Sequence, residues 1–531
     1  MTDRTCGEAA IALLEAYGVD TVFGIPGVHT LDLYKGLGRS PIRHVLARHE
    51  QGAGFMADGY ARVTGRPGVV VPITGPGVTN AATAIGQAWS DSVPMLVLSS
   101  ENPTTDLGLG RGRLHEIMSQ EAVTAPMCAF SATARRPEDL PELIHRAFAT
   151  FASQRPRPVH ISIPLNVLAA PARFPIEARP LPRKPQPDEA ALARAAKLLD
   201  QAERPLIIAG GGALGAEEPL RSIAERLGAP VMLTIAAKGM LPETHPLCLG
   251  STLPDRNTQQ LLALADLVLA IGTELAETDS WVETLPIGRM VRIDIDERLI
   301  ASSAYPAEVG IVSDAAPALK GLLGRMGGGN RPGGLAEKVP AIRSAIAAGI
   351  RPLRRKHLTL LETVREAVPE ETAIMTDMTQ IAYSANQHYP SARPRTWHHP
   401  NGFGTLGWAL PAAIGAKLAR PELPVLTVVG DAGILFSVQE LSTAANLKLP
   451  LPILLWNNDG LGQIRDDMIE RQMPEVGVTP EENPDYQMLA TAFGCRAVRP
   501  GSLGEVGEAL RTAFADDRPT LIEVRQDAAF L

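Results

Sequence analysis

The chain has 531 residues, of which 45% are hydrophobic and 20% are charged, and it carries a net charge of −8. This length exceeds what one hydrophobic core normally organises, so we expect roughly three domains. The acidic balance, without any basic run, argues against nucleic acid as a partner, and no apolar run approaches the roughly 20 residues that cross a membrane.

The first predicted element is a helix that ends near Tyr17. Thr5 and Glu8 have the spacing of an N-terminal capping box, and the residues before them lack the apolar core of a secretory signal. The cysteines lie far apart in the sequence, with no Cys-x-x-Cys pair, so neither a zinc site nor a disulfide framework is indicated. These observations predict a cytoplasmic protein.

The first third of the chain contains two glycine turns and one helical segment. The turns are residues 23–27 and residues 74–77, and the second is followed by Asn80. Between them, a helical and charge-mixed pattern begins near Glu50. A glutamate in such a run is usually solvated, so a functional role for Glu50 depends on the residues that flank it.

Two breaks divide the chain into three blocks. Residues 165–190 hold six prolines and no sustained periodicity, which predicts an extended surface strap, and residues 326–334 form a glycine-rich second break. Each block alternates short β-rich runs with helical patterns, for example the strands expected at 68–73 and 94–99. We therefore predict an α/β protein with three doubly wound parallel-sheet domains. Their expected bounds are residues 1–170, 188–326 and 345–531.

The middle block contains a glycine motif with two interpretations. Gly210, Gly212 and Gly215 follow a strand pattern and open a helix pattern, with the spacing of a dinucleotide-binding fingerprint. That fingerprint also requires an acid about 20 residues further on, and the next strand pattern, residues 231–234, ends without one. We favour a turn that allows tight strand-to-helix packing, and we regard bound FAD as unlikely.

Polar residues follow two strand patterns in the last quarter of the chain. Residues 425–429 and 451–456 are apolar runs of strand length, and they are followed by Asp431 and Asn458. Because parallel strands end at the same edge of a sheet, we expect these two side chains to converge there. Carboxylate and amide oxygens, together with a nearby carbonyl such as that of Gly460, suit Mg²⁺, which completes its coordination with phosphate and water.

Together these segments resemble one family, the thiamine-diphosphate enzymes of the acetolactate synthase, pyruvate decarboxylase and benzoylformate decarboxylase group. The match covers essentially the whole chain in the family's order. The C-terminal signature of this family opens with Gly-Asp-Gly and closes with Asn-Asn, and here Ala432 replaces the second glycine. We expect this replacement to be tolerated, because the position contributes backbone rather than side chain.

The resemblance implies the cofactors and the residues that hold them. Glu50 takes the place of the glutamate that activates thiamine diphosphate, and Leu406 takes that of the bulky residue that bends it. The residues expected to bind this cofactor are Glu50, Pro26, Gly27, Thr74, Asn80, Thr379, Gln380, Gly404, Thr405, Leu406, Gly430, Ala432 and Gly433. The residues expected to bind Mg²⁺ are Asp431, Asn458 and Gly460. Relatives share each site between two subunits, so the resemblance implies a homodimer or a homotetramer.

The resemblance also implies a small 2-oxo acid as substrate, because the cofactor accepts the electron pair that is released when carbon dioxide leaves. Pyruvate decarboxylases carry an acid after the first Pro-Gly and a His-His pair in a later loop, where this chain has Val28 and His115-Glu116. Acetolactate synthases carry Phe-Gln-Glu in that loop, which we do not find at this position. His115, Glu116 and His29 are the candidates for proton transfer.

One sub-branch of this family resembles the sequence more closely than the others do. Residues 23–34 and 108–116 resemble 5-guanidino-2-oxopentanoate (2-ketoarginine) decarboxylases. A guanidinium group favours a carboxylate partner. The candidate carboxylates are Glu116, Asp279, Asp459, Asp466 and Asp467. The leading prediction is a non-oxidative 2-oxo-acid decarboxylase of amino-acid catabolism, with an acetolactate synthase-type carboligase as the alternative and an inactive relative as a distant third.

Overall fold

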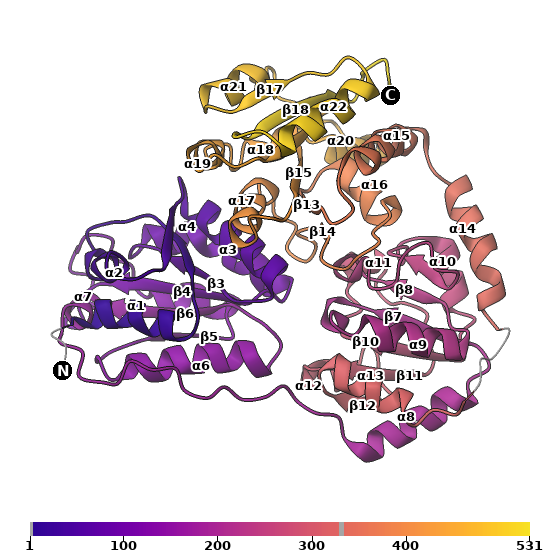
Figure 1. The fold of residues 1–531 in the computed structure, drawn as a ribbon, viewed down its shortest axis with the longest axis horizontal. Helices are drawn as coiled ribbons and strands as arrows, with labels where there is room; N and C mark the ends of the chain where they lie inside the picture. The colour runs from indigo at the N-terminus through magenta and orange to yellow at the C-terminus, as the bar shows by residue number, and fades with distance from the viewer. Residues whose placement is uncertain (1–3, 329–333) are drawn as a thin grey trace. The chain divides into compact units, whose positions relative to one another are not determined.

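Three six-stranded sheets form the framework of the protein, which is known from a computed structural model (Figure 1). The structure describes residues 4–328 and 334–531. The chain folds into two compact units. One unit contains the chain up to Arg183 together with Ile374–Thr379 and Gly402–Ala528, and the other contains Lys184–Ala373, Gln380–Asn401 and Ala529–Leu531.

The first sheet lies within the first 170 residues. In spatial order its strands are β2 (Arg43–Leu46), β1 (Thr21–Gly24), β3 (Gly68–Val71), β4 (Met95–Glu101), β6 (Val159–Pro164) and β5 (Phe130–Thr133). Its helices are α1 (Cys6–Ala16), α2 (Leu31–Leu37), α3 (Glu50–Thr64), α4 (Pro76–Ser90), α5 (Gln120–Thr124), α6 (Asp139–Ser153) and α7 (Leu165–Leu168). The predicted capping box is confirmed, because Glu8 N–H donates to Thr5 Oγ1 and Thr5 N–H donates to Glu8 Oε2.

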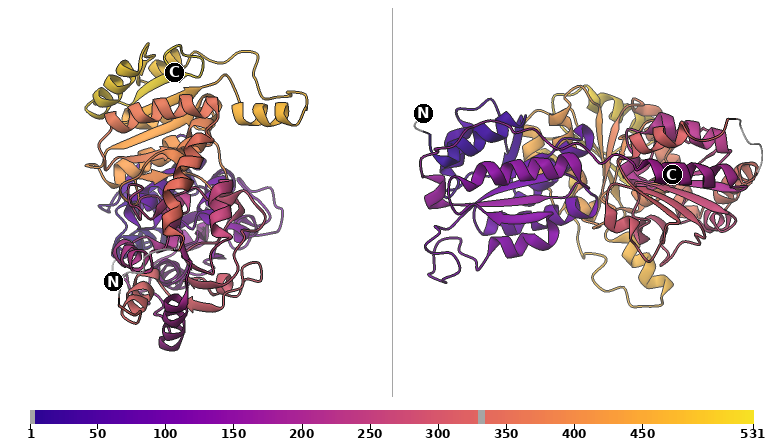
Figure 2. Two further views of the ribbon diagram at one scale, coloured as in Figure 1. Left: turned by 90° about the vertical axis from the view of Figure 1, so that its right-hand side faces the viewer. Right: turned by 90° about the horizontal axis from the view of Figure 1, so that it is seen from below.

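The second sheet is covered by helices on both faces (Figure 2). Its strands in spatial order are β12 (Val309–Val312), β11 (Met290–Asp294), β10 (Leu267–Ile271), β7 (Pro205–Ala209), β8 (Val231–Leu233) and β9 (Cys248–Gly250). The helices of this region are α8 (Glu189–Gln201), α9 (Glu217–Leu227), α10 (Arg256–Leu262), α11 (Glu277–Ser280), α12 (Glu297–Ile300), α13 (Ala315–Leu323), α14 (Val339–Ala348) and α15 (Pro352–Ala367). Ile207 and Leu269 enter the core shared with α8, α9 and α13, whereas Leu206 and Val268 enter the core shared with α10 and α14. Burial on both faces explains why these strands are continuous apolar runs.

The third sheet is built from the last part of the chain. Its strands in spatial order are β14 (Trp397–His398), β13 (Ala373–Thr376), β15 (Val425–Gly430), β16 (Pro452–Asn457), β18 (Thr520–Arg525) and β17 (Arg496–Val498). The helices are α16 (Gln380–His388), α17 (Ala409–Ala419), α18 (Asp431–Ile434), α19 (Glu440–Asn446), α20 (Gly462–Glu470), α21 (Tyr486–Ala492) and α22 (Leu503–Phe514). Both views of Figure 2 show α20 standing away from the sheet on long flanking loops.

The strand registers confirm the predicted fold class. Neighbouring strands are parallel throughout the first two sheets and from β15 to β18. Each sheet grows outward in both directions from one central pair, which is β1 and β3, β7 and β10, or β13 and β15. The carboxyl ends of such a pair form the crevice in which open α/β sheets bind ligands.

Several predicted boundaries differ from the structure. The proline-rich strap is shorter than expected, because α7 occupies its first residues and α8 begins at Glu189. Between these helices the chain forms no helix or extended strand, apart from one bridge of Pro171 to Thr5. The second break, residues 326–334, lies largely outside the described residues. Among the described helices, none combines the length and the apolar character that a membrane span requires.

The glycine motif of the second sheet is a close contact between two turns. A Cβ atom at Gly210 would lie 2.4 Å from the carbonyl oxygen of Gly272, and one at Gly212 would lie 2.8 Å from the Gly272 Cα. A short 3-10 turn, Gly211–Ala213, lies within the motif, and the helix that the motif precedes, α9, begins at Glu217. Backbone packing at the β7–β10 crevice therefore accounts for two of the three glycines. The expectation that FAD is absent stays a prediction.

Helices α3 and α17 pack in close, antiparallel contact within one unit. A Cβ atom at Gly59 would lie 2.0 Å from the Ala412 carbonyl oxygen, and one at Gly415 would lie 1.9 Å from the Met56 carbonyl oxygen. Residues nearer the end of α3 thus contact residues nearer the start of α17, as in an antiparallel pair. Backbones that approach this closely leave no room for side chains at either glycine.

We expect Gly59→Ala to destabilise the protein, because its added methyl group would meet the backbone of α17 rather than a movable side chain. Overpacking of this kind costs about 1–3 kcal/mol, which corresponds to a fall of roughly 2 °C or more in the thermal midpoint of a domain of this size. Differential scanning fluorimetry measures this change. Gly504→Ala is the matched control, since the glycine is exposed near the start of α22 with only Ser502 Oγ nearby, and an unchanged or higher midpoint is expected there. Equal midpoints for Gly59→Ala and wild type would contradict the close contact.

Candidate active site

Glu50 is the first residue of α3 and follows β2 at the carboxyl edge of the first sheet. Its Oε2 accepts a hydrogen bond of 3.0 Å from Nδ2 of Asn80 in α4, and Glu50 is 9% exposed. The other carboxylate oxygen has no protein hydrogen-bond partner among the described residues. An oriented carboxylate with one oxygen available can accept a hydrogen bond from a ring nitrogen of a ligand and so hold a proton on that nitrogen. Sequence reasoning named both residues separately, and the structure brings them together.

The first predicted glycine turn lies in the crevice between β1 and β3. The Gly27 N–H donates to Thr30 Oγ1 over 3.0 Å, and the Thr30 hydroxyl donates back to the Gly27 carbonyl oxygen. Behind the turn, a Cβ atom at Gly27 would collide with the side chain of Ile73. Pro26-Gly27 is therefore a fixed turn beside the end of β3, and Ile73 leaves no room for a side chain at Gly27.

The second glycine turn is held by Gln120, a residue that sequence reasoning missed. Thr74 is fully buried and donates its hydroxyl to Ser100 Oγ over 2.9 Å. Gly75 has φ +67° and donates its N–H to Oε1 of Gln120, whose Nε2 donates to the Ser100 carbonyl oxygen over 2.8 Å. Gln120 is 45 residues from Gly75 in the sequence, so only the folded structure reveals its function in the turn.

His29 and His115 face each other beside these turns. Their ring centroids are 5.1 Å apart with the planes tilted by 65°, and His115 has φ +61°. A Cβ atom at Gly75 would lie 2.3 Å from the His115 carbonyl oxygen, so His115 lies against the second glycine turn. The Nδ1 atoms of both histidines are buried without a hydrogen-bond partner in the described part of the chain. Burial, followed by the proximity of His115, lowers the pKa of His29, which favours its neutral form.

Glu116 stabilises the loop in which it lies. Its two carboxylate oxygens accept hydrogen bonds from the backbone N–H groups of Arg111 and Arg113, at 3.0 and 2.9 Å. These hydrogen bonds hold the pKa of Glu116 below its usual range. The side chains of the same two arginines bind Asp106 instead. Glu116 is thus placed next to His115, but its carboxylate is already used to close the loop.

The predicted metal residues lie together at the carboxyl edge of the third sheet. Asp431 is 1% exposed, and its Oδ2 accepts a 2.7 Å hydrogen bond from the Gly460 N–H. Asp431 also accepts a hydrogen bond from the backbone of Asn458. Burial raises the pKa of Asp431 to about 6. A divalent cation would stabilise the ionised form of this carboxylate, so the donor set of carboxylate, amide and carbonyl oxygens fits Mg²⁺.

The two neighbouring asparagines have different functions. Asn457 Nδ2 donates to Glu523 over 2.8 Å, and its Oδ1 accepts from the Asp459 N–H. Asn457 therefore fixes the turn after β16, whereas Asn458, the next residue, contacts Asp431 through its backbone.

Asp377 connects the two candidate cofactor loops of the third sheet, and sequence reasoning missed it. It follows β13, is fully buried, and accepts a hydrogen bond from the Gly407 N–H over 2.9 Å. A Cβ atom at Gly433 would lie 3.5 Å from the Asp377 carboxyl carbon, and one at Gly430 would lie 2.9 Å from Thr379 Oγ1. Burial raises the pKa of Asp377 to about 7, while backbone N–H donors oppose this shift. The residues predicted to hold the diphosphate and the ring thus share one buried anchor.

The predicted ring-binding loop is fastened to α4. Thr405 Oγ1 donates to Oε1 of Gln87 over 2.9 Å, and Gly402 N–H donates to Asp91 over 2.8 Å. Gly404 has φ +67°, and Leu406, the expected wedge, is partly exposed. The loop ends in α17, so its position depends on the packing of α3 against α17. Gln380, the remaining predicted cofactor residue, begins α16.

Within one chain, Glu50 and the ring-binding loop lie at opposite ends of the α3–α17 contact. Trp408, which directly follows the loop, donates its ring N–H to Asp58 over 3.0 Å. Asp58 is eight residues after Glu50, or about 12 Å along the axis of α3. At the end of α3 where Glu50 lies, a Cβ atom at Gly52 would instead contact Glu440.

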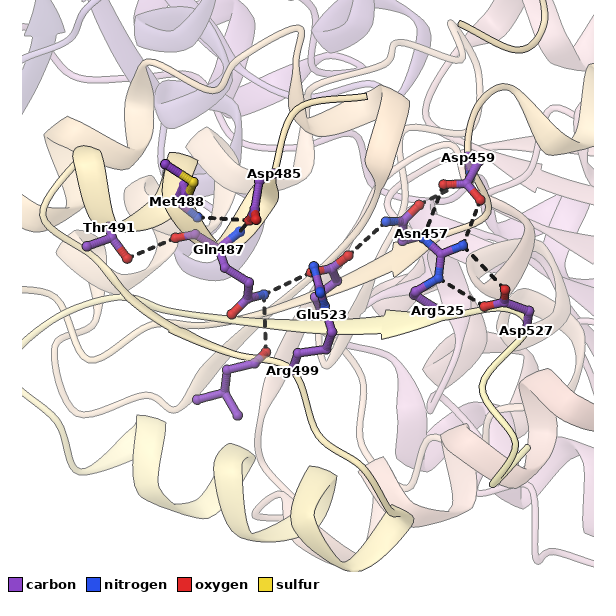
Figure 3. A network of polar contacts seen from close by, with 11 residues as sticks. Asn457, Asp459, Asp485, Gln487, Met488, Thr491, Arg499, Glu523, Arg525 and Asp527 are labelled. Atoms are coloured by element: carbon purple, nitrogen blue, oxygen red, sulfur yellow. Dashed lines mark hydrogen bonds and ion pairs between the residues drawn. The ribbon is translucent and has the colours of Figure 1, made fainter. Parts of the chain in front are cut away.

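The sequence candidates for a guanidinium partner have other partners. Asp459 forms an ion pair with Arg525 at 2.8 Å, and Arg525 also binds Asp527 (Figure 3). Asp279 accepts a hydrogen bond from Asn401 Nδ2. Asp466 and Asp467 lie on α20, and Asp467 accepts from Gln463. These pairings make the carboxylates suggested by the sequence less available to a substrate.

Comparison with known proteins identifies this framework. The family models of thiamine pyrophosphate enzymes match the N-terminal TPP binding domain at residues 4–123, the central domain at residues 192–322 and the C-terminal TPP binding domain at residues 377–524. The chain therefore belongs to the thiamine pyrophosphate enzyme family. This finding confirms the resemblance that the sequence motifs suggested, and with it thiamine diphosphate as the cofactor.

The relatives of this chain match it over nearly its full length. The probable 2-ketoarginine decarboxylase AruI of Pseudomonas aeruginosa is 52% identical, with 99% of this chain and 94% of the relative covered. The acetolactate synthase isozyme 1 large subunit of Escherichia coli is 33% identical, with 99% and 94% covered. The acetolactate synthase large subunit of Corynebacterium glutamicum is 34% identical, with 99% and 87% covered.

Proposed function

We propose that this protein is a thiamine-diphosphate-dependent decarboxylase that converts 5-guanidino-2-oxopentanoate to 4-guanidinobutanal and carbon dioxide. The observation that carries this proposal is the 52% identity, over 99% of the chain, to a relative named as a probable 2-ketoarginine decarboxylase. The acetolactate synthases are more distant, at 33% and 34% identity. An inactive relative is disfavoured by the presence of Glu50, Asp431 and Asn458.

In this proposal, each group of site residues has its own function. The bound cofactor supplies an electron sink for the bond to carbon dioxide. Glu50, oriented by Asn80, holds a proton at the ring nitrogen of the cofactor. Asp431, Asn458 and the Gly460 carbonyl hold Mg²⁺ and thereby the diphosphate. His29 and His115 are the proposed proton donors to the product, since their Nδ1 atoms are buried beside the glycine turns.

The remaining assignments belong to the same proposal. The domains extend over residues 1–170, 188–326 and 345–531, and the central one holds no FAD. The enzyme acts in the cytoplasm, in amino-acid catabolism, without nucleic acid or membrane as partner. It assembles as a homodimer or homotetramer. A carboligase of the acetolactate synthase type is the alternative function, and a second keto acid incorporated into the product would support it.

A shared active site follows from the proposed roles of Glu50 and Leu406. Both would contact one cofactor molecule, yet in one chain they lie at opposite ends of the α3–α17 contact. A second copy of the chain can supply Glu50 to the ring-binding loop and metal residues of the first. This arrangement supports the assignment of a dimer as the smallest active unit.

Two inactive variants should therefore complement each other. Glu50→Gln and Asp431→Ala chains, mixed under conditions that allow subunit exchange, are expected to recover up to about a quarter of the wild-type sites. This fraction assumes random pairing into two-site dimers, in which each mixed dimer contains one intact site. Decarboxylation rates before and after mixing measure the recovery. No recovery, with exchange demonstrated by labelled chains, would place both halves of the site on one chain.

Substrate choice is tested by comparing kcat/KM for a panel of 2-oxo acids. We expect 2-ketoarginine to be turned over far better than pyruvate or benzoylformate, because neither of these acids carries a guanidinium group. An uncharged acid of similar length separates the effect of charge from that of size. A preference for the uncharged acid would contradict the guanidino substrate and assign the pocket to another 2-oxo acid.

A further inference from the structure

Glu101 is a buried carboxylate at the edge of the first sheet that has no assigned function. It is the last residue of β4, at the same carboxyl edge as the turn that follows β3, and it is 5% exposed. Gln120 hydrogen-bonds both Glu101 and the Gly75 N–H, and Gly75 lies against His115. A single side chain therefore connects Glu101 to the turn beside the candidate proton donors.

Glu101 has fewer compensating partners than several other buried carboxylates. Asp58 binds Arg62, Asp106 binds two arginines, and Glu523 binds Arg499. Glu440, which has no such ion pair, accepts two backbone N–H groups and a threonine hydroxyl. Glu101 accepts only a long backbone bond of 3.3 Å and the amide of Gln120, and no Lys or Arg of the described chain pairs with it. Burying a carboxylate with so few donors is costly unless a ligand supplies the missing charge.

The neighbouring residue is also incompletely satisfied. Asn102 is 4% exposed, and its Nδ2 has no hydrogen-bond partner within residues 4–328 and 334–531. At this ligand-binding edge, a weakly hydrogen-bonded carboxylate thus lies beside an amide nitrogen without a partner. Buried polar groups in native proteins are nearly always paired, so such a combination indicates a polar ligand.

We propose that Glu101 binds the guanidinium group of the substrate, an inference that rests on the proposed function. A guanidinium group presents two parallel N–H donors that match the two oxygens of a carboxylate. It would supply the positive charge that Glu101 lacks. The carboxylates first suggested by the sequence are less suitable, because Glu116 closes its own loop and Asp459 is paired with Arg525.

Burial raises the pKa of Glu101 to about 7. Only burial and the hydrogen bonds from Asn102 N–H and Gln120 act on this carboxyl, with no contribution from a charged side chain. The ionised form therefore becomes dominant as the pH rises through about 7. Selectivity for a cationic substrate over a neutral one should increase over the same range.

The test compares 2-ketoarginine with 5-ureido-2-oxopentanoate, its neutral isostere, on the holoenzyme. Glu101→Gln should lower kcat/KM for 2-ketoarginine by about 30-fold or more, the factor expected when one partner of a buried charge pair is removed, and should change the ureido acid by less than about 3-fold. Glu121→Gln is the matched control, because Glu121 lies in α5 and bonds Thr133 instead. It should leave both values unchanged.

The pH dependence provides a second measurement that needs no variant. In wild type, the ratio of kcat/KM for 2-ketoarginine to that for the ureido acid should rise between about pH 6 and pH 8, and in Glu101→Gln it should be flat. A wild-type preference for 2-ketoarginine that is independent of pH, or is retained in Glu101→Gln, would overturn the inference and leave the proposed function intact. A wild-type preference for the ureido acid would instead overturn the proposed function.

Discussion

Glu50→Gln should bind thiamine diphosphate with nearly wild-type affinity and lose about 10²-fold or more in kcat. Glutamine preserves the size of the side chain and can still bond Asn80, so the contacts that position the cofactor remain. It cannot hold a proton at the ring nitrogen as a carboxylate does, and removal of a proton-positioning group costs at least this factor.

The direct readout is the exchange of the C2 proton of the bound cofactor, followed by quenched-flow NMR in deuterated water. Exchange should slow by a factor similar to that in kcat. Glu121→Gln is again a suitable control, because this glutamate lies in the same domain but bonds a threonine at the end of β5. Exchange at the wild-type rate in Glu50→Gln would show that another group activates the cofactor.

Asp431→Ala should abolish Mg²⁺-dependent binding of thiamine diphosphate. Mg²⁺ keeps few protein ligands and depends on the charged one, so the remaining amide and carbonyl oxygens cannot hold it. The substitution also removes the acceptor of the Gly460 N–H, which loosens the turn that carries the other proposed ligands.

Titration of the apoprotein with thiamine diphosphate, with and without Mg²⁺, measures this effect by intrinsic fluorescence. Asp527→Asn is the matched control, because this aspartate is exposed near the end of the same sheet and binds Arg525. Control and wild type should show the same Mg²⁺ dependence. Unchanged cofactor affinity in Asp431→Ala would contradict the metal assignment.

The sequence predicts those parts of the fold and site that depend on local pattern. Asp431 and Asn458 could be placed at one sheet edge because each follows an apolar run of strand length, and β15 and β16 are indeed parallel neighbours. The strands of the second sheet can also be recognised in the sequence as apolar runs, because both of their faces are buried. Helix limits are less predictable, and α7 begins at Leu165, within the segment that the prolines predicted to be an extended strap.

Residues whose function depends on contacts between distant segments could not be predicted. Asp377 follows an apolar run as Asp431 does, but its importance comes from the Gly407 N–H that it binds thirty positions away. Gln120 becomes a neighbour of both Gly75 and Glu101 only when the first sheet has formed. The antiparallel contact of α3 with α17 likewise depends on glycines that carry no pattern of their own.

Product analysis with 2-ketoarginine tests the central proposal most directly. Purified protein, supplied with thiamine diphosphate and Mg²⁺, should release one carbon dioxide and one 4-guanidinobutanal for each substrate molecule consumed, and should release neither without the cofactor. Carbon dioxide and aldehyde are quantified together by mass spectrometry and NMR. Two substrate molecules consumed for each carbon dioxide, with a condensed keto acid as product, or no carbon dioxide at all, would contradict the assignment as a decarboxylase of this acid.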